Sequence, residues 1–299
     1  MSKILHVFDV SPFIHAGHVN KASKLETVVN IGTTWKTQVT PTGGTSLLFN
    51  TLYEVAGTGD CVFCCDRRPT IKQEMLPGYK ASRAHRREIE VEKGACEYIL
   101  EKCNCSIIAR AGYEADDIIY SIIKAKHDEY DKIYIYTGDS DLYFLVDEVV
   151  SIRPSSSRAK TVTLENFKES TGCDYNLITV KKIIFGDSSD EIPGIPKEDR
   201  KMLHEFFYKE QFVGKLGNKE FVKSWMDYMF PQYSSRVDLV FPLQVDDIPT
   251  DFKPIDKRML INFGDSINNR CFRNRAEQTF NVNPYIKELQ EMGFYIEED

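Results

Sequence analysis

Nine carboxylates recur between residues 9 and 190, alone or in short groups. They are Asp9, Asp66, Glu114, Asp116, Asp117, Asp139, Asp141, Asp187 and Asp190. If they meet in the fold, their charges raise one another's pKa values unless a cation lies among them. Hard divalent cations prefer oxygen ligands, and Mg²⁺ binds carboxylates together with substrate phosphates. The chemistry that this set predicts is metal-assisted phosphodiester hydrolysis.

Three of the acidic groups follow apolar runs of the kind that form buried strands. The runs cover residues 4–10, 61–66 and 132–137, and a fourth covers 106–109. Helical patterns lie between them, at 46–56 and 114–126. Strands that alternate with helices predict a parallel, doubly wound α/β sheet. Because ligands bind such sheets at the carboxyl ends of the strands, we expect the acids to meet there.

Local spacing supports a metal site rather than scattered acids. Asp139 and Asp141 are two residues apart, so in an extended segment both point to one face. Glu114, Asp116 and Asp117 open a helix, where one acid would compensate the helix dipole. Three acids in four residues exceed that need. Two ions roughly 3.5–4 Å apart could use so many ligands, one to activate a water and one to stabilise the leaving oxygen.

A basic segment follows Asp66. Between residues 67 and 87 the only acid is Glu74, against Arg67, Arg68, Lys72, Lys80, Arg83, Arg86 and Arg87. Lys80 and Arg83 are three residues apart, which places them on one face of a helix and lets both reach a phosphate. Tyr79 could stack on a base, or it could be a core tyrosine. In isolation, a solvated basic helix face would explain the segment.

Bulk properties fit a two-domain globular protein of 299 residues with 42% apolar and 28% charged residues. The first residues form neither a signal peptide nor a membrane span, so we expect a cytoplasmic protein and no membrane partner. The eight cysteines are then expected to be free thiols. The formal net charge of −7 becomes +2 without the nine carboxylates, so the remaining surface could hold phosphates.

Helical patterns beyond residue 162 suggest a nuclease domain at 1–180 and a helical domain at 181–299.

Six motifs in this order resemble the flap endonuclease/5′→3′ exonuclease family. They are Phe8-Asp9, Phe63-x-x-Asp66, Tyr79-Lys80-Ala81-Ser82-Arg83, Glu114-Ala115-Asp116-Asp117, Thr137-Gly138-Asp139-Ser140-Asp141-Leu142 and Gly186-Asp187-Ser188-Ser189-Asp190-Glu191-Ile192-Pro193-Gly194. The resemblance runs from Asp9 to about Pro196, and the overall size is closest to the stand-alone bacteriophage RNase H type. It implies a PIN-like doubly wound sheet with a helical arch, followed by a smaller helical domain with a helix-hairpin-helix-type element.

The resemblance also implies how the acids divide between two Mg²⁺ ions, for which Mn²⁺ could substitute. Asp9, Asp66 and Asp116 would hold one ion, with Glu114 reaching it through water. Asp139, Asp141 and Asp187 would hold the other, with Asp117 and Asp190 reaching it through waters. Asp116 and Asp139 would be catalytic together with Lys80 and Arg83, which lie in the arch through which a 5′ single strand passes. The resemblance implies that the arch binds nucleic acid through Arg67, Arg68, Lys72, Tyr79, Lys80, Arg83, Arg86 and Arg87.

For the second domain, the resemblance implies a grip on duplex phosphates by Lys197, Arg200 and Lys201. A solvated helix face is the alternative explanation for these three residues. Members of the family often hold K⁺ in a glycine-rich hairpin at this place. The chain has Pro193-Gly194-Ile195-Pro196 but lacks the Gly-x-Gly that follows in the family, which speaks against a K⁺ site.

The function expected is a Mg²⁺-dependent, structure-specific 5′ nuclease that removes RNA primers or 5′ flaps in replication or repair. Its substrate would be a DNA or RNA–DNA duplex with a 5′ flap, nick or single strand, and its products would carry 5′-phosphates and 3′-hydroxyls. We expect a monomer with replication proteins, such as a single-strand-binding protein, as partners. The alternatives are a PIN-like ribonuclease and a non-catalytic duplex-binding relative, although the latter would be expected to have lost some of the acids.

Overall fold

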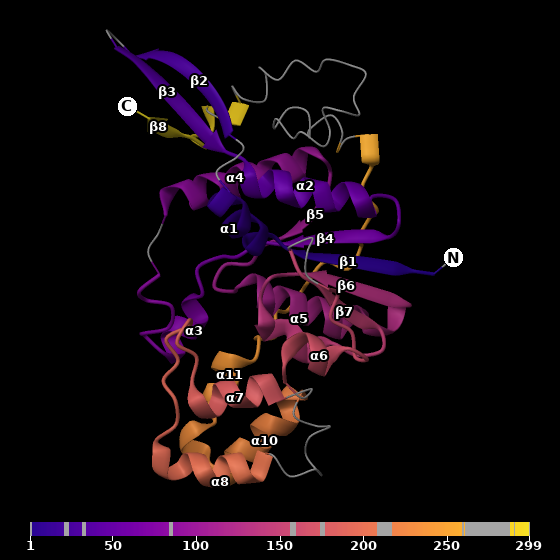
Figure 1. The fold of residues 1–299 in the computed structure, drawn as a ribbon, viewed down its shortest axis with the longest axis vertical. Helices are drawn as coiled ribbons and strands as arrows, with labels where there is room; N and C mark the ends of the chain where they lie inside the picture. The colour runs from indigo at the N-terminus through magenta and orange to yellow at the C-terminus, as the bar shows by residue number, and fades with distance from the viewer. Residues whose placement is uncertain are drawn as a thin grey trace.

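The fold was obtained as a computed structural model. It describes residues 2–20, 24–31, 34–83, 86–155, 160–173, 177–207, 217–258, 260, 288–289 and 291–298. A central sheet, seen near its edge in Figure 1, separates helices above it from helices below it, and a further group of helices forms the lower end of the molecule.

Five parallel strands form the central sheet in the order β5-β4-β1-β6-β7. The strands are β1 Ile4–Asp9, β4 Asp60–Cys64, β5 Ser106–Ile108, β6 Lys132–Tyr136 and β7 Val150–Arg153. Their central residues are almost all buried on both faces, as expected of a sheet that helices cover on each side. The parallel, doubly wound sheet predicted from the sequence is confirmed.

Helices cover both faces of this sheet (Figure 1). Above it lie α1 Val10–Asn20, α2 Gly43–Val55 and α4 Arg87–Lys102, and below it lie α5 Ala115–Lys126 and α6 Phe167–Thr171. On the upper side, the ring of Phe8 stacks between those of Phe63 and Tyr136, with centroid distances of 5.0 and 4.3 Å. Packed aromatic rings on three adjacent strands therefore hold the middle of the sheet.

The lower end of the molecule consists of α7 Leu177–Phe185, α8 Lys197–Phe207, α10 Lys219–Met229 and α11 Ser235–Val240, with the 3₁₀ turn η3 Pro231–Tyr233. Their shared core also contains Tyr79, Tyr120 and Phe144 from the sheet-bearing part of the chain. The predicted domain boundary at residue 180 falls inside α7, so no linker separates the two parts there.

The C-terminal segment corrects the prediction that residues 181–299 form one helical domain. Strand β8 Ile296–Glu298 pairs with β3 Thr34–Pro41 in a second, three-stranded sheet at the opposite end of the molecule (Figure 1). The amide of Cys61 in β4 donates to the carbonyl of Lys253 at 3.1 Å. The chain thus returns to the sheet after α11, because apolar residues such as Leu260 and Leu289 pack beside α2 and α4.

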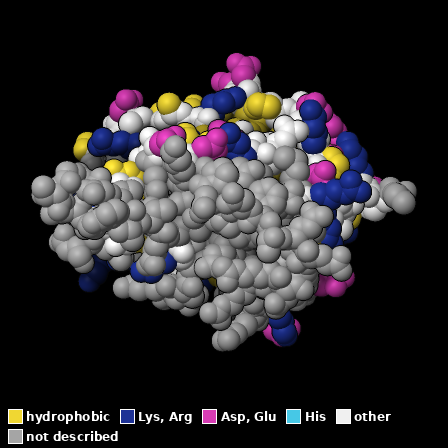
Figure 2. Space-filling view, turned by 90° about the horizontal axis from the view of Figure 1, so that it is seen from above, with side chains coloured by type: hydrophobic (Ala, Val, Ile, Leu, Met, Phe, Trp, Pro, Cys, Tyr) yellow, Lys and Arg dark blue, Asp and Glu magenta, His cyan; other side chains and the backbone are white. Residues whose placement is uncertain are grey.

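The apolar residues between positions 12 and 40 have no clear helical or strand periodicity in the sequence. The structure forms α1 there and then β2 Lys24–Ile31, which pairs with β3 in an antiparallel hairpin. Figure 2 views this end of the molecule, and basic and acidic side chains are interspersed where its residues are described.

Two further expectations concern cysteines and membranes. All seven cysteines in the described ranges are free thiols, and Cys61 and Cys64 lie in β4 as strand residues. Within the same ranges, no helix combines the length and the apolar character needed to cross a bilayer.

Candidate metal centre

The carboxyl ends of the central strands bring the predicted acids together. Asp9 is the last residue of β1 and pairs in register with Cys64 of β4, which brings Asp66 close to it. Asp139 follows β6 by three residues, and Glu114 is the N-cap of α5. Asp9, Asp66, Glu114, Asp116 and Asp139 line one pocket of about 130 Å³. Lys80 and Arg83 also line it, together with Ser11, Pro12 and His15 of α1, which no sequence motif had indicated.

Asp9 supplies the most direct sign that a cation belongs in this pocket. Its Oδ2 accepts a hydrogen bond from Thr137 Oγ1 at 2.8 Å, but its Oδ1 is buried without a hydrogen-bond partner. A buried carboxylate oxygen that lacks a donor is costly to leave without compensation. A divalent ion ligated by this oxygen would remove the cost, so the residues present fit the metal that the acids predict.

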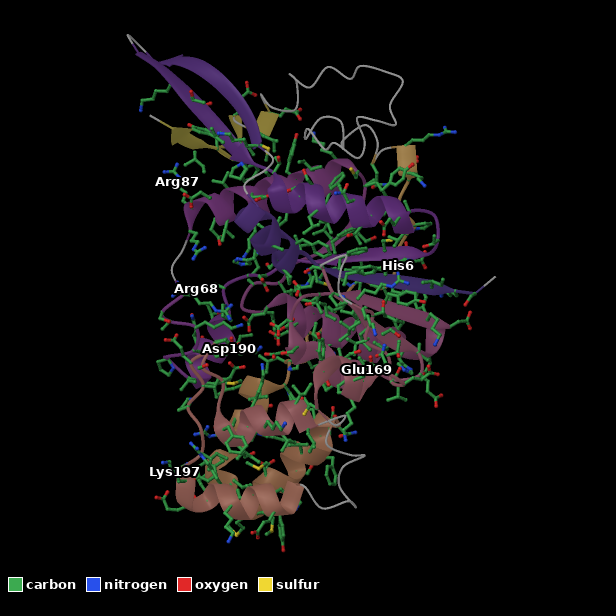
Figure 3. The ribbon with its side chains drawn as sticks, in the orientation of Figure 1. His6, Arg68, Arg87, Glu169, Asp190 and Lys197 are labelled. Atoms are coloured by element: carbon green, nitrogen blue, oxygen red, sulfur yellow. The ribbon has the colours of Figure 1, made fainter. Side chains whose placement is uncertain are left out.

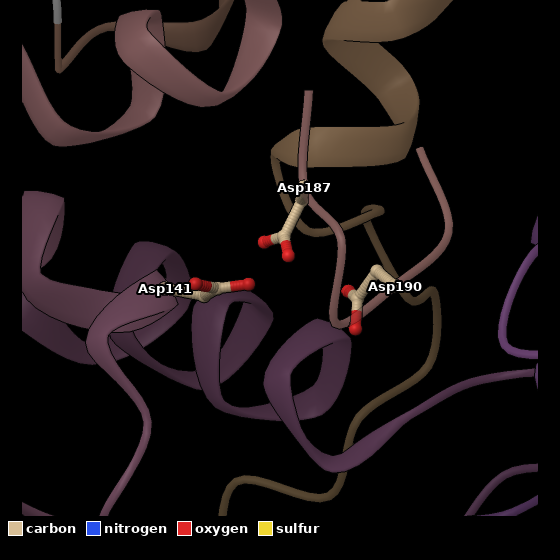
Figure 4. Close-up of side chains that lie close together, drawn as sticks. All are labelled: Asp141, Asp187 and Asp190. Carbon is tan, nitrogen blue, oxygen red and sulfur yellow. The ribbon is translucent and has the colours of Figure 1, made fainter. Parts of the chain in front are cut away.

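A second acidic group lies where the helical end meets the sheet. One carboxylate oxygen each from Asp141, Asp187 and Asp190 lies within 4.8 Å of the others. Figure 4 shows the carboxylates of Asp141 and Asp187 facing each other, while Asp190 comes from the same loop as Asp187. Among the described residues, this is the one group of three or more possible metal ligands whose ligand atoms all lie this close to one another.

Lys182 of α7 neutralises part of this second group, and sequence reasoning missed it. Its ammonium group contacts the Asp141 carboxylate and lies 2.6 Å from Asp187 Oδ2. The signal that could have revealed it is the pair of lysines in the otherwise apolar helix LITVKKIIF, one turn before the acidic loop. A polar residue in such a run commonly has a specific partner.

The protonation equilibria of the acids differ according to their access to protein cations. Burial and the nearby charges of Asp66 and Asp139 raise the pKa of Asp9 well above its ordinary value, although the Thr137 hydrogen bond opposes the shift. Burial, with the charges of Asp139 and Asp9, raises the pKa of Asp116 in the same way. Burial tends to raise the pKa of Asp187 too, but the hydrogen bonds from Lys182 and Ser189 and the charge of Lys182 together outweigh it and lower that pKa to about 2. Without a cation, ionisation of Asp9 and Asp116 is thus unfavourable, whereas ionisation of Asp187 is favoured.

Glu114 is held by three side chains of the basic segment. Its Oε1 lies 2.5 Å from Lys80 Nζ, and its Oε2 accepts from Lys72 Nζ at 2.9 Å and from the Tyr79 hydroxyl at 2.7 Å. Although burial opposes ionisation, Lys72 and Lys80 together lower the pKa of Glu114 to about 2. The prediction that Lys72 and Tyr79 contact nucleic acid is therefore wrong, because both side chains are buried beneath the site.

The placement of Asp117 corrects its assignment as a metal residue. It is fully buried, and Asp117 Oδ1 accepts from the Leu243 amide at 2.7 Å and lies 3.1 Å from Lys72 Nζ. Its Oδ2 accepts from the Glu114 amide at 3.0 Å in a capping box at the start of α5. Both oxygens are thus occupied by protein donors, which makes Asp117 a structural carboxylate at the helix N-terminus.

Two local conformations also differ from those predicted. Asp139 and Asp141 are not in an extended segment, because Asp139 caps the 3₁₀ helix η2 Ser140–Leu145 and accepts from the Asp141 amide at 2.9 Å. Asp139 therefore faces the Asp9 pocket, while Asp141 lies with Asp187. Lys80 and Arg83 do not share a helix face, because α3 Thr70–Met75 ends before them and Lys80 has a positive φ of 52°.

The non-helical segment at 79–83 is tied to the acidic loop. The Lys80 amide donates to the Asp190 carbonyl at 3.2 Å, and Lys80 Nζ lies 3.4 Å from Asp190 Oδ1. Arg83 Nη2 contacts the same oxygen at 2.8 Å. A non-glycine residue in the left-handed region persists where its surroundings hold it, and such residues cluster at functional sites. Lys80 and Arg83 thus reach the acids from a turn.

The other predicted nucleic-acid contacts lie along one side of the molecule. Figure 3 shows Arg87, Arg68, Asp190 and Lys197 on that side, and Arg86 precedes α4 with its side chain exposed. Arg67 pairs with Glu97 through two hydrogen bonds, at 2.8 and 2.7 Å. A shallow pocket of about 370 Å³ at the start of α8 is lined by Lys197, Arg200, Lys201, Glu205 and Phe185.

The sequence of this chain is similar to those of known proteins. The sequence model of a family described as "5'-3' exonuclease, N-terminal resolvase-like domain" matches residues 8–172. DNA polymerase I of Caldicellulosiruptor bescii is 32% identical over 195 residues, which are 60% of this chain and 22% of that protein. The 5′-3′ exonuclease of Mycoplasmopsis pulmonis is 32% identical over 126 residues, 41% of this chain and 42% of that one. The matches thus span less than half of either relative.

The fold is also similar to solved structures. The structure of the T5 D15 protein co-crystallised with metal ions has a TM-score of 0.54 to this chain and covers 97% of it and 99% of the T5 chain, at 16% identity. A structure of T5 5′-exonuclease with bound zinc has a TM-score of 0.53 at the same identity and coverage. At these identities the similarity establishes the fold alone.

Proposed function

This chain belongs to the 5′-3′ exonuclease family, and from that premise we propose that it is a structure-specific 5′ nuclease. Its substrates would be DNA or RNA–DNA duplexes that carry a 5′ flap, a nick or a 5′ single strand. It would act in primer removal or flap processing during replication or repair. The names of the relatives and the order of the acidic motifs support this proposal.

One observation carries the proposal. Eight of the nine predicted carboxylates gather in two adjoining groups at the end of a parallel sheet, and a basic turn with Lys80 and Arg83 contacts both Glu114 and Asp190. Acids that hold divalent cations and cations that can hold a phosphate are thus next to each other. This is the arrangement that hydrolysis of a phosphodiester requires.

In this proposal, the acids would bind the two metal ions and the basic residues would bind the phosphate. Asp9, Asp66, Asp116 and Asp139 would hold one Mg²⁺, and Asp141, Asp187 and Asp190 would hold a second, with Glu114 at the edge of the first group. When bound, the ions would supply an activated water and stabilisation of the leaving oxygen. Lys80 and Arg83 would leave the carboxylates to bind the scissile phosphate and offset the charge that develops on it. Hydrolysis adds water across the P–O3′ bond, which leaves a 5′-phosphate and a protonated 3′-hydroxyl.

The deciding experiment compares four labelled substrates in Mg²⁺: a 5′-flap duplex, a nicked duplex, an RNA–DNA hybrid and single-stranded RNA. We expect cleavage of the structured duplexes and its loss in D139N, with duplex binding retained. Asp246→Asn is the matched control, because Asp246 is an exposed acid outside the site. Substitution of Mn²⁺ or Ca²⁺ for Mg²⁺ in the same assay tests which metal is used.

Each rival outcome is distinct. Preferential cleavage of single-stranded RNA would favour a PIN-like ribonuclease. Duplex binding without cleavage in any divalent metal would favour a non-catalytic relative. Full activity of D139N would contradict the assignment of the centre itself.

A further inference from the structure

Three consecutive carbonyl groups after the acidic loop are bound by two arginines. Arg236 of α11 donates through Nη1 to the Pro193 carbonyl and through Nη2 to the Gly194 carbonyl at 3.4 Å. Arg200 of α8 donates through Nε to the Ile195 carbonyl at 2.5 Å. Two guanidinium groups that are 36 positions apart in the sequence thus bind one short stretch of backbone.

The chemistry of the stretch explains why it needs a cation. Within the described part of the chain, no backbone amide of a turn or loop donates to these three oxygens. Carbonyl oxygens that lack backbone donors form a partially negative surface, which water, a cation or cationic side chains must satisfy. A guanidinium group carries a permanent charge and five donors, so it can bind two adjacent carbonyls and keep donors for other partners.

Neighbouring side chains hold both guanidinium groups in place. Arg236 lies over the Tyr233 ring, 5.6 Å from its centroid, and the Tyr233 hydroxyl donates to the Asp199 carboxylate on α8. Arg200 lies 5.8 Å from the centroid of the Phe185 ring. A Cβ at Gly194 would lie 2.7 Å from Arg200 Nη2 and 2.5 Å from the Phe185 carbonyl oxygen. Glycine at 194 is therefore what allows this close approach.

The same stretch continues directly from the metal-binding loop. Asp187 and Ile192 exchange two backbone hydrogen bonds, at 2.9 and 2.8 Å, which close the loop that carries Asp187 and Asp190. The Ile195 amide donates to the Ile184 carbonyl at 2.9 Å. The position of residues 193–195 thus fixes how the loop leaves α7 and enters α8.

We propose that Arg200 and Arg236 are positioning residues that serve as built-in cations, holding the carbonyls of residues 193–195 where a monovalent ion would otherwise be needed. The proposal rests on the proposed nuclease function, because it links the duplex-facing start of α8 to the loop with Asp187 and Asp190. It has a specific consequence. The wild-type protein should not depend on the identity of the monovalent cation, whereas a variant that lacks a guanidinium group should.

The test measures kcat and KM on a 5′-flap duplex in Mg²⁺ at constant ionic strength, with either K⁺ or tetramethylammonium as the monovalent cation. We expect the two salts to give the same wild-type values within about twofold. For R236A and R200A, we expect kcat/KM to fall about tenfold in tetramethylammonium, the scale of a lost charged hydrogen bond. K⁺, or guanidinium at low millimolar concentration, should restore most of the loss. Arg236→Lys should lose less than R236A, and Arg258→Ala, an exposed arginine elsewhere, should match wild type.

A second readout separates this proposal from the proposed function. Thermal unfolding of R236A and R200A in the two salts, without divalent metal or DNA, reports cation binding to the turn directly. We expect K⁺ to raise the midpoint of both variants more than that of wild type. If the wild type cleaves but the variants respond equally to the two salts in both measurements, the built-in cation proposal is wrong. If the wild type does not cleave any substrate, the function fails, and the unfolding measurement alone decides whether the turn binds a cation.

Discussion

Lys182 Nζ lies 2.6 Å from Asp187 Oδ2 and also contacts the Asp141 carboxylate, so a protein cation lies among the three acids nearest to each other. A divalent ion at Asp141, Asp187 and Asp190 must share this space with Lys182 or displace its ammonium group. Glu114 and Asp190 have the same relationship with Lys80. The site is thus partly neutralised by lysines before any metal binds.

The first prediction concerns this lysine. We expect K182M to bind Mg²⁺ at the Asp141 group about tenfold more tightly, because it removes a like charge from the ion's position. The apo protein should lose stability at the same time, because Asp141 and Asp187 are left without their cation. Calorimetric titration with Mg²⁺ and urea unfolding without metal measure the two effects. The neighbouring variant K181M is the control, and weaker Mg²⁺ binding by K182M alone would show that Lys182 does not compete with the ion.

The second prediction contrasts two adjacent acids. D116N should stabilise the metal-free protein against unfolding, because burial and the charges of Asp139 and Asp9 raise the pKa of Asp116 and make its ionised form costly. It should also abolish cleavage. D117N should leave Mg²⁺ affinity within about twofold but destabilise the fold by roughly 3–5 kcal/mol, since it breaks a buried pair with Lys72. If D117N weakened Mg²⁺ binding as much as D116N, Asp117 would belong to the metal centre after all.

The third prediction concerns the basic turn. K80A should lower kcat about 10²–10³-fold on a flap substrate, the usual effect of removing one donor to developing charge. Duplex binding, measured by fluorescence anisotropy in the D139N background, should change little. Lys160→Ala provides the comparison, because Lys160 is an exposed lysine whose ion-pair partner, Glu169, is not one of the nine acids. A K80A variant with normal kcat and raised KM would place Lys80 in binding alone.

The fourth prediction concerns pH. His6 is buried beside Tyr136 and Thr58, and burial, followed by the charge of Arg153, lowers its pKa from 6.5 to about 4. The folded state therefore favours neutral His6, and between these values the unfolded chain binds more protons. Stability from this group is complete above pH 6.5 and falls as the pH drops toward 4, by roughly 3 kcal/mol in all.

Comparison with a His6→Gln variant isolates this contribution. The difference in unfolding free energy between wild type and variant, from urea titrations, should shrink steadily from pH 7 to pH 4. A difference that stayed constant over this range would contradict the assignment of the shift to His6.

The amino-acid sequence by itself determined where the acids would meet. Each of the apolar runs that ends at Asp9, Asp66 and Asp139 forms a parallel strand, and the carboxyl ends of such strands share one edge whatever the other contacts are. The start of α5 at Glu114 could be predicted for the same reason, because N-capping depends on a few adjacent residues.

Only the tertiary structure decided which acids are free to bind metal and which basic residues face the substrate. Asp116 and Asp117 are adjacent and chemically identical, yet the amide of Leu243, 126 residues beyond Asp117, bonds Asp117 and not its neighbour. Lys72, Lys182, Arg200 and Arg236 find their partners through contacts between elements that the sequence does not order in space. Hydrogen-bond and ion-pair partners distant in the chain follow from packing, and no local spacing encodes them.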